Sequence, residues 1–279
     1  MRVALFATCL VDIFFPEVGE STVRLLRRLG CEVAYPPQGC CGQPAWNAGH
    51  REAAAAMAEG LIRSLGGYDY VVTPSGSCAA MIRHHYPELF AHRPDLAEEA
   101  RALAARTYEL SEFLVRVLGA DLRALGARFP GTVVYHRSCH LTRELGVREE
   151  PLALLDQVEG VERRELERAD LCCGFGGTVS VKLPAVAVAM ADDKLADVRA
   201  TGAEYLVGSD CSCLMHLAGR MQRTGGGPRV LHLAQLLEMA TRPGAASPAS
   251  GEAMGPRAAG SVPTAPGPGA APVREGDGR

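Results

Sequence analysis

Several features that mark large classes of protein are missing from this sequence. No apolar run approaches the roughly 20 residues that span a bilayer, and the stretch from Val3 to Phe15 is interrupted by Asp12. Basic residues form no block, only two of the 29 are lysines, and the net charge is −3. We therefore expect neither a transmembrane segment nor nucleic-acid binding, which depends on clustered positive charge.

Nucleotide-binding signatures are absent as well. The glycines at positions 174, 176 and 177 are followed by Val179, so they do not form a Gly-x-Gly-x-x-Gly loop after a strand. No Gly-x₄-Gly-Lys-Ser/Thr loop occurs either. Such loops hold the phosphates of dinucleotides and nucleoside triphosphates. We therefore expect that the chain does not reduce NAD by itself.

The N-terminal residues lack the sustained apolar stretch and cleavage site of a secretory signal, because the chain enters a predicted strand directly after Met1 and Arg2. We expect a cytoplasmic protein, and the sequence leaves peripheral membrane association open. Disulfides rarely persist in the cytoplasm. The ten cysteines therefore point to metal or redox chemistry.

Eight of these cysteines form two quartets with the same order. Each has one cysteine after a short apolar strand, then a Cys-Cys-Gly triplet, then a cysteine after another apolar strand. The first quartet is Cys9, Cys40, Cys41 and Cys78, and the second is Cys139, Cys172, Cys173 and Cys213. Equivalent cysteines are 130 (139 − 9) to 135 (213 − 78) positions apart, as expected of a duplicated unit with small loop insertions. Four thiols from three loops are a typical donor set for an iron–sulfur cluster.

Each half of the chain alternates predicted strands with predicted helices. The strands cover residues 3–7, 32–35, 70–73, 132–136, 162–166 and 205–207, and the helices cover 17–29, 51–65, 94–117, 151–157 and 184–200. This order predicts an α/β fold with two Rossmann-like parallel-sheet halves related by the internal repeat. Ligands gather at the carboxyl ends of parallel strands. We therefore expect Cys9, Cys78, Cys139 and Cys213 to converge on one edge.

The predicted domain boundaries follow the repeat. Residues 1–118 form the first cysteine-rich unit with a helical extension, and residues 119–242 form the second. From 243 to 279 the chain is rich in Pro, Gly and Ala and contains no aromatic residue. Such a composition buries too little apolar surface to offset chain entropy, so we expect a disordered tail.

The doubled cysteines favour a cluster over a single ion. Adjacent cysteines point in different directions, so the pairs at 40–41 and 172–173 suit neighbouring irons of a cluster. The glycines that follow allow backbone N–H groups to approach the sulfurs, which stabilises anionic clusters. Zinc is the alternative cofactor, although the close Cys-x₂₋₄-Cys pairs of most structural zinc sites are absent from the quartets.

Two cysteines outside the quartets and three nearby histidines are further candidates for roles at the metal sites. Cys31 lies in a helix-to-strand turn and is interpreted as structural, whereas Cys211 is a candidate substitute ligand. His136, His140 and His216 could hydrogen-bond a cluster sulfur or move protons. Solvent-facing loop positions are the favoured interpretation for these three histidines.

The motifs resemble the cysteine-rich, or CCG, domain family over about residues 1–240. This family includes the B subunit of heterodisulfide reductase, the iron–sulfur subunit of glycolate oxidase and the lactate utilization protein A group. Thr-Pro-Ser-Gly-Ser-Cys at Thr73–Cys78 and Cys-Cys-Gly-Phe-Gly-Gly at Cys172–Gly177 are similar to stretches of the last group.

One departure from the family pattern affects the ligand set. The heterodisulfide reductase subunit ends its motif with Cys-x-x-Cys, whereas Ser75 and Asp210 stand at the first of those positions here. Each site then has four thiols and one candidate oxygen ligand. A different cluster type, an oxygen in place of one sulfur, and a repeat that binds no cluster are the alternatives. We expect an intact site in each half.

The resemblance implies an iron–sulfur electron-transfer subunit of a complex that oxidises L-lactate to pyruvate. It implies a [4Fe-4S]-type cluster, and as partners a ferredoxin-like iron–sulfur subunit and a third small subunit. The chain would then be a non-autonomous part of an oxidoreductase. The alternatives are a heterodisulfide-reductase-like or glycolate-oxidase-like redox subunit and a zinc-bound structural subunit.

Overall fold

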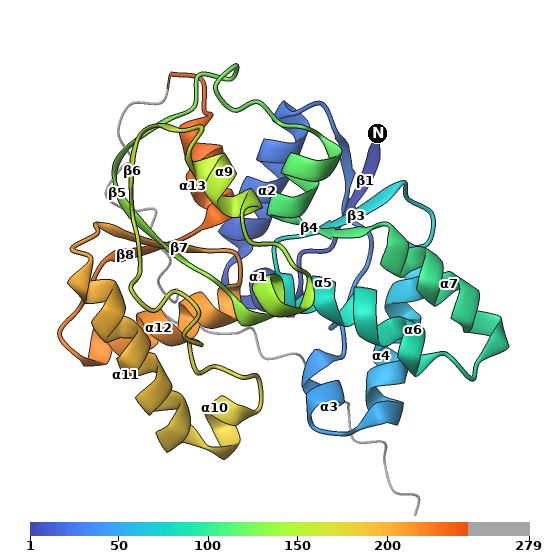
Figure 1. Cartoon of the computed structure of the whole chain (residues 1–279). Coiled ribbons are helices and arrows are strands. Elements are labelled where there is room, and N and C mark those ends of the chain that lie inside the picture. Colours follow the sequence, from blue (N-terminus) through green and yellow to red (C-terminus); the bar gives the residue numbers. More distant parts are fainter. Residues whose placement is uncertain (245–279) are drawn as a thin grey trace, which may run out of the picture.

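The computed structural model describes residues 1–244, in which two four-stranded parallel sheets lie side by side (Figure 1). The first sheet has the order β2-β1-β3-β4, and the second has the order β6-β5-β7-β8. The strands are β1 (Arg2–Leu5), β2 (Glu32–Ala34), β3 (Tyr70–Thr73), β4 (Thr107–Glu109), β5 (Arg128–His136), β6 (Glu159–Arg164), β7 (Tyr205–Gly208) and β8 (Arg229–His232). The predicted α/β class and the internal repeat are confirmed.

Strand register is the same in the two sheets. Val3 of β1 lies opposite Tyr70 of β3, and Val133 of β5 lies opposite Tyr205 of β7. These pairs are related by the 130- and 135-residue offsets that relate the cysteines. Equivalent loops therefore leave the two sheets at equivalent points.

Helices connect the strands as βαβ units require. Those labelled η are short π-helical segments. In the first repeat the helices are α1 (Cys9–Phe14), α2 (Pro16–Arg28), α3 (Gln43–Asn47), α4 (Arg51–Leu65), α5 (Gly76–Ala80), η1 (Met81–His85), α6 (Tyr86–Leu89), α7 (Pro94–Ala105), α8 (Leu110–Glu112) and η2 (Phe113–Val117). In the second they are η3 (His140–Glu144), α9 (Glu150–Leu155), α10 (Val179–Lys182), α11 (Pro184–Ala200), α12 (Cys211–Arg223) and α13 (Leu233–Ala240). The predicted bounds of α4 and α11 are confirmed.

The predicted helix over residues 94–117 is wrong in its middle. Helix α7 ends at Ala105, and Thr107–Glu109 then form β4, which pairs with β3. A threonine and a tyrosine suit a strand, and the pairing satisfies backbone groups at the edge of β3. Strand β8, which extends the second sheet beside β7 in the same way, was not predicted either.

A shared apolar core joins the repeats. Helices α2 and α13 pack against each other (Figure 1), and both contribute fully buried leucines to a cluster that includes strands of both sheets. At its margin, Arg28 of α2 pairs with Glu238 of α13 and donates a 2.6 Å hydrogen bond to Thr241. The predicted boundary at residue 119 stays a prediction.

An approximate two-fold axis passes between the repeats. The equivalent residues Ser75 and Asp210 form an isolated antiparallel bridge, as a two-fold axis produces when it relates two parallel-sheet units. Around this axis α5 packs on η3, and α12 packs on α1. The contact with η3 is close, because a Cβ on Gly76 would lie 2.9 Å from the Cβ of Leu141.

Glu109 links strand β4 to the stability of the fold. It is fully buried and caps α8 by accepting hydrogen bonds from the backbone N–H groups of Ser111 and Glu112. Burial raises the pKa of Glu109 to about 8. The folded chain therefore keeps this proton at pH values where the unfolded chain has lost it, so its contribution to stability falls as the pH rises from about 4.5 to about 8.

We expect the Glu109→Gln variant to be more stable than the wild type at pH 8. Glutamine keeps an acceptor for the cap and never carries the charge, so the expected gain is about 4 kcal/mol. The difference should decline as the pH approaches 4.5. Denaturant unfolding across this pH range measures it, and a difference independent of pH would contradict the assignment.

Within residues 1–244 no helix has the length and apolar composition that crossing a bilayer requires. The predicted disordered tail, residues 243–279, lies outside the described residues from position 245 onward.

Candidate metal centres

The quartet cysteines lie just past the carboxyl ends of strands. Cys9 begins α1 after β1, the Cys40–Cys41 pair follows β2, and Cys78 lies in α5 after β3. Because β2, β1 and β3 are adjacent and parallel, these three loops leave the same edge of the sheet. The second repeat arranges Cys139, Cys172, Cys173 and Cys213 in the same way after β5, β6 and β7.

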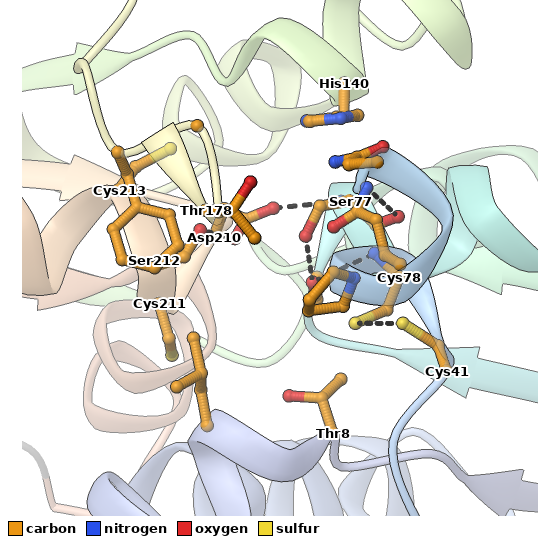
Figure 2. Close-up of a pocket in the computed structure, with 18 of the residues that line it drawn as sticks. Thr8, Cys41, Ser77, Cys78, His140, Thr178, Asp210, Cys211, Ser212 and Cys213 are labelled. Atoms are coloured by element: carbon orange, nitrogen blue, oxygen red, sulfur yellow. Dashed lines mark hydrogen bonds between the residues drawn. The ribbon is translucent and has the colours of Figure 1, made fainter. Parts of the chain in front are cut away.

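All eight quartet cysteines line one cavity of about 370 Å³. Figure 2 shows Cys41 and Cys78 on one side of it and Cys213 on the other, with Asp210 between them. Helices α3 and α10, which follow the two Cys-Cys-Gly triplets, lie on opposite sides of the molecule's lower part in Figure 1. The expected convergence of Cys9, Cys78, Cys139 and Cys213 is confirmed, and the two quartets face a common space.

The first quartet consists of closely spaced thiols. The Sγ atoms of Cys41 and Cys78 are 3.4 Å apart, and those of Cys9 and Cys40 are 4.0 Å apart. The backbone N–H of Gly42 donates a 3.4 Å hydrogen bond to Cys40 Sγ. Gly42 has φ of 86°, a conformation that glycine adopts without a steric penalty. The turn therefore aims a backbone donor at a ligand sulfur.

Proton sharing makes the members of each quartet unequal. Hydrogen bonds from Cys41 and Cys9 lower the pKa of Cys40, and hydrogen bonds to Cys40 raise the pKa values of both donors. Cys172 has a lowered pKa for the same reason, since Cys139 and Cys173 donate to it. One thiol of each quartet therefore loses its proton more readily than its neighbours, and the thiolate is the form that binds metals.

The second quartet has extra support from α11. The backbone N–H groups of Gly174 and Phe175 donate 3.4 Å hydrogen bonds to Cys172 Sγ and Cys173 Sγ. Buried Lys194 donates a 2.9 Å hydrogen bond to the backbone carbonyl of Ala169. Lys194 was not among the predicted site residues, although lysine at only two positions of an otherwise arginine-rich chain was a signal for it.

The predicted solvent-facing position of His136 is wrong. His136 is the last residue of β5 and only 1% exposed. A ring nitrogen of His136 and the Sγ atoms of Cys173 and Cys213 all lie within 4.8 Å of one another. Burial lowers the pKa of His136 to about 3, so the imidazole is neutral.

The other two histidines lie farther toward the surface. His140 is partly exposed, with Nδ1 3.6 Å from Cys139 Sγ and Nε2 3.5 Å from Glu144. His216 Nε2 lies 3.2 Å from the backbone carbonyl of Ala187. His140 begins the helix η3 and His216 lies within α12, and both are half-buried, so the predicted solvent-facing loop positions are wrong for these two histidines as well.

Ser75 and Asp210 connect the two repeats. Asp210 accepts a 2.9 Å hydrogen bond from the backbone N–H of Ser77 in the other repeat (Figure 2) and a 2.7 Å bond from Ser212. Ser75 Oγ accepts from the backbone N–H of Cys78 and caps α5. Both residues also line the cavity, so their predicted role as oxygen ligands stays a prediction.

The two remaining cysteines differ in location. Cys211 is buried and lines the cavity, and burial raises the pKa of its thiol. Its candidate role as a substitute ligand stays a prediction. Cys31 packs in the shared apolar core, as its structural interpretation requires.

The residues around the cavity fit a soft metal centre. Thiolates bind Zn²⁺ and the irons of iron–sulfur clusters, and backbone N–H groups directed at the sulfurs stabilise the negative charge of such centres. Cys9, Cys40, Cys41 and Cys78 would hold one centre, and Cys139, Cys172, Cys173 and Cys213 the other. This donor set indicates metal or cluster binding.

Comparisons with known proteins agree with the repeat. The model of the cysteine-rich domain family, CCG, matches residues 3–83 and 133–218. The chain is 50% identical over 238 residues to "Lactate utilization protein A" of Geobacillus thermodenitrificans, covering 85% of this chain and 98% of that protein. It is 48% identical over 238 residues to the protein of the same name from Bacillus cytotoxicus, with the same two coverages.

A solved structure shows the same fold. The chain is similar to a hypothetical protein from Helicobacter pylori with a TM-score of 0.60 and 12% identity. The match covers 87% of this chain and 49% of that protein, so this chain spans about half of its length. The chain belongs to the CCG cysteine-rich domain family and, within it, to the family of lactate utilization protein A.

Proposed function

We propose that this chain is the iron–sulfur electron-transfer subunit of a complex that oxidises L-lactate to pyruvate. The observation that carries the proposal is the pair of thiol quartets around one cavity, in a chain half identical to proteins named for lactate utilization. Its relatives' names support lactate as the substrate, and the cysteine geometry supports a redox centre.

The residues of each quartet have defined tasks in this proposal. The four thiols of each repeat bind one cluster, and a bound cluster supplies reversible one-electron chemistry. The N–H groups of Gly42, Gly174 and Phe175 lie close to three ligand sulfurs and stabilise their negative charge. Buried Cys41 and Cys173 keep one side of each quartet away from water.

Other components must complete the reaction. The sequence has no dinucleotide-binding loop, so the electrons from lactate reach this chain through another protein or through a cofactor bound elsewhere. A ferredoxin-like iron–sulfur subunit and a third small subunit are the proposed partners, in a cytoplasmic assembly. The alternatives are a heterodisulfide-reductase-like or glycolate-oxidase-like redox subunit and a zinc-bound structural subunit. The serine and aspartate at positions 75 and 210, where the heterodisulfide reductase subunit has cysteine, argue against the first of these.

The test of the cofactor is metal analysis of anaerobically purified full-length protein. We expect iron together with acid-labile sulfide, roughly four of each per cluster for a [4Fe-4S] centre. We also expect an electron paramagnetic resonance signal that appears or disappears on redox titration. Zinc without labile sulfide would contradict electron transfer and support a zinc-bound structural subunit.

A further inference from the structure

The second repeat contains a polar group that the first repeat lacks. His136 precedes Cys139 by three positions, and the residue three positions before Cys9 is Phe6. Both side chains are buried at the carboxyl ends of the central strands, His136 at 1% and Phe6 at 0% exposure. The fold therefore accepts an apolar ring at this position, and the second repeat has an imidazole there instead.

The imidazole has no hydrogen-bond partner among residues 1–244. Neither Nδ1 nor Nε2 of His136 is satisfied, although both atoms are buried. Leaving a buried polar group unpaired destabilises a fold. A phenylalanine at this position would avoid the free-energy cost of an unpaired buried group. The presence of an imidazole therefore indicates a bound partner other than the described protein atoms.

The surroundings of the ring indicate the class of that partner. A ring nitrogen and the Sγ atoms of Cys173 and Cys213 lie within 4.8 Å of one another. Metal–nitrogen and metal–sulfur bonds are roughly 2.0 and 2.3 Å long, so a slight closure of these three atoms would bring them to a single metal. Neutral imidazole and thiolate both bind iron and zinc.

We infer that His136 is a nitrogen ligand to the metal centre held by the second cysteine quartet. The two repeats then bind chemically different centres, with sulfur ligands alone in the first and mixed sulfur and nitrogen ligands in the second. This inference rests on the part of the proposed function in which the quartets hold metal.

The informative variant is His136→Phe, because it installs the residue that the first repeat carries at the equivalent position. His140→Gln is the matched control, since His140 also neighbours a quartet thiol but is partly exposed. Both changes are made in full-length protein that also carries Cys41→Ser. This background disables the first quartet, so that the metal signals come from the second.

Nitrogen ligation is measured on anaerobic protein labelled with ¹⁵N-histidine. For a paramagnetic centre the method is electron–nuclear double resonance, and for zinc it is X-ray absorption at the metal edge. We expect a directly bonded nitrogen in the Cys41→Ser protein and with His140→Gln, and none with His136→Phe. We also expect His136→Phe to lose its metal to a chelator at least about tenfold faster.

The metal-free proteins provide a readout that does not depend on the centre. Without metal, His136→Phe should unfold at a higher temperature than its parent, because it removes an unpaired buried imidazole. If the second quartet holds metal with no bonded nitrogen, or if the nitrogen signal persists in His136→Phe, the inference is wrong and the proposed function stands. If neither quartet of the wild-type protein holds metal, both fail.

Discussion

Serine at position 41 or 173 is expected to remove the metal from one quartet and leave the other loaded. Cys41 and Cys173 are the most buried members of their quartets, and the Sγ of Cys41 lies 3.4 Å from that of Cys78. A hydroxyl keeps the size of the side chain but replaces a soft thiolate with a hard oxygen donor. Each single variant should therefore contain about half of the wild-type iron and sulfide, and the double variant close to none.

Growth on L-lactate measures the functional consequence. A strain that depends on this gene for growth on lactate should lose that growth with either variant, because the proposed electron transfer runs through both centres. Cys31→Ser is the matched control, since Cys31 is also a buried thiol but lies in the shared core. Undiminished growth on lactate with both Cys41→Ser and Cys173→Ser would refute the proposed function.

Alanine at position 174 is expected to destabilise the loop that carries Cys172 and Cys173. Gly174 has φ of 88°, and an added Cβ would lie 2.4 Å from the backbone oxygen of Ala187 and 2.9 Å from the Cβ of Met190. The clash with the α11 backbone cannot be relieved by a side-chain rotation, so the loop must move away from the helix. We expect a loss of about 3 kcal/mol or more in the free energy of unfolding.

The same movement should affect the second metal centre. The N–H of Gly174 donates to Cys172 Sγ, and displacement of the loop breaks this contact. Gly202→Ala is the control, because Gly202 also has a positive φ, of 63°, but an added Cβ would meet nothing within 4 Å. It should cost only about 1 kcal/mol. Equal urea midpoints for the two variants would show that the contact with α11 is unimportant.

The amino-acid pattern was sufficient for the class of fold and for the eight candidate ligands. Short apolar strands separated by helices allow few arrangements other than a parallel sheet covered by helices, and the doubled Cys-Cys-Gly pattern identified the repeat. Because a parallel sheet places successive strand ends at one edge, the convergence of the cysteines was predictable as well. The omitted strands β4 and β8 are only three and four residues long and lie at sheet edges, which is too short for an alternating pattern to identify them.

Features that depend on contacts between the repeats were decided by the tertiary structure alone. The common cavity, the bridge between Ser75 and Asp210 and the burial of His136 arise from docking one repeat on the other or from packing distant segments together. No local periodicity records such contacts, because the partners are separated by tens of residues or more. The sequence by itself therefore determined which thiols gather in each repeat. Only the packing of the repeats decided that both quartets face one cavity. The same packing buries the imidazole of His136 beside the second quartet, where the sequence had predicted a solvent-facing position.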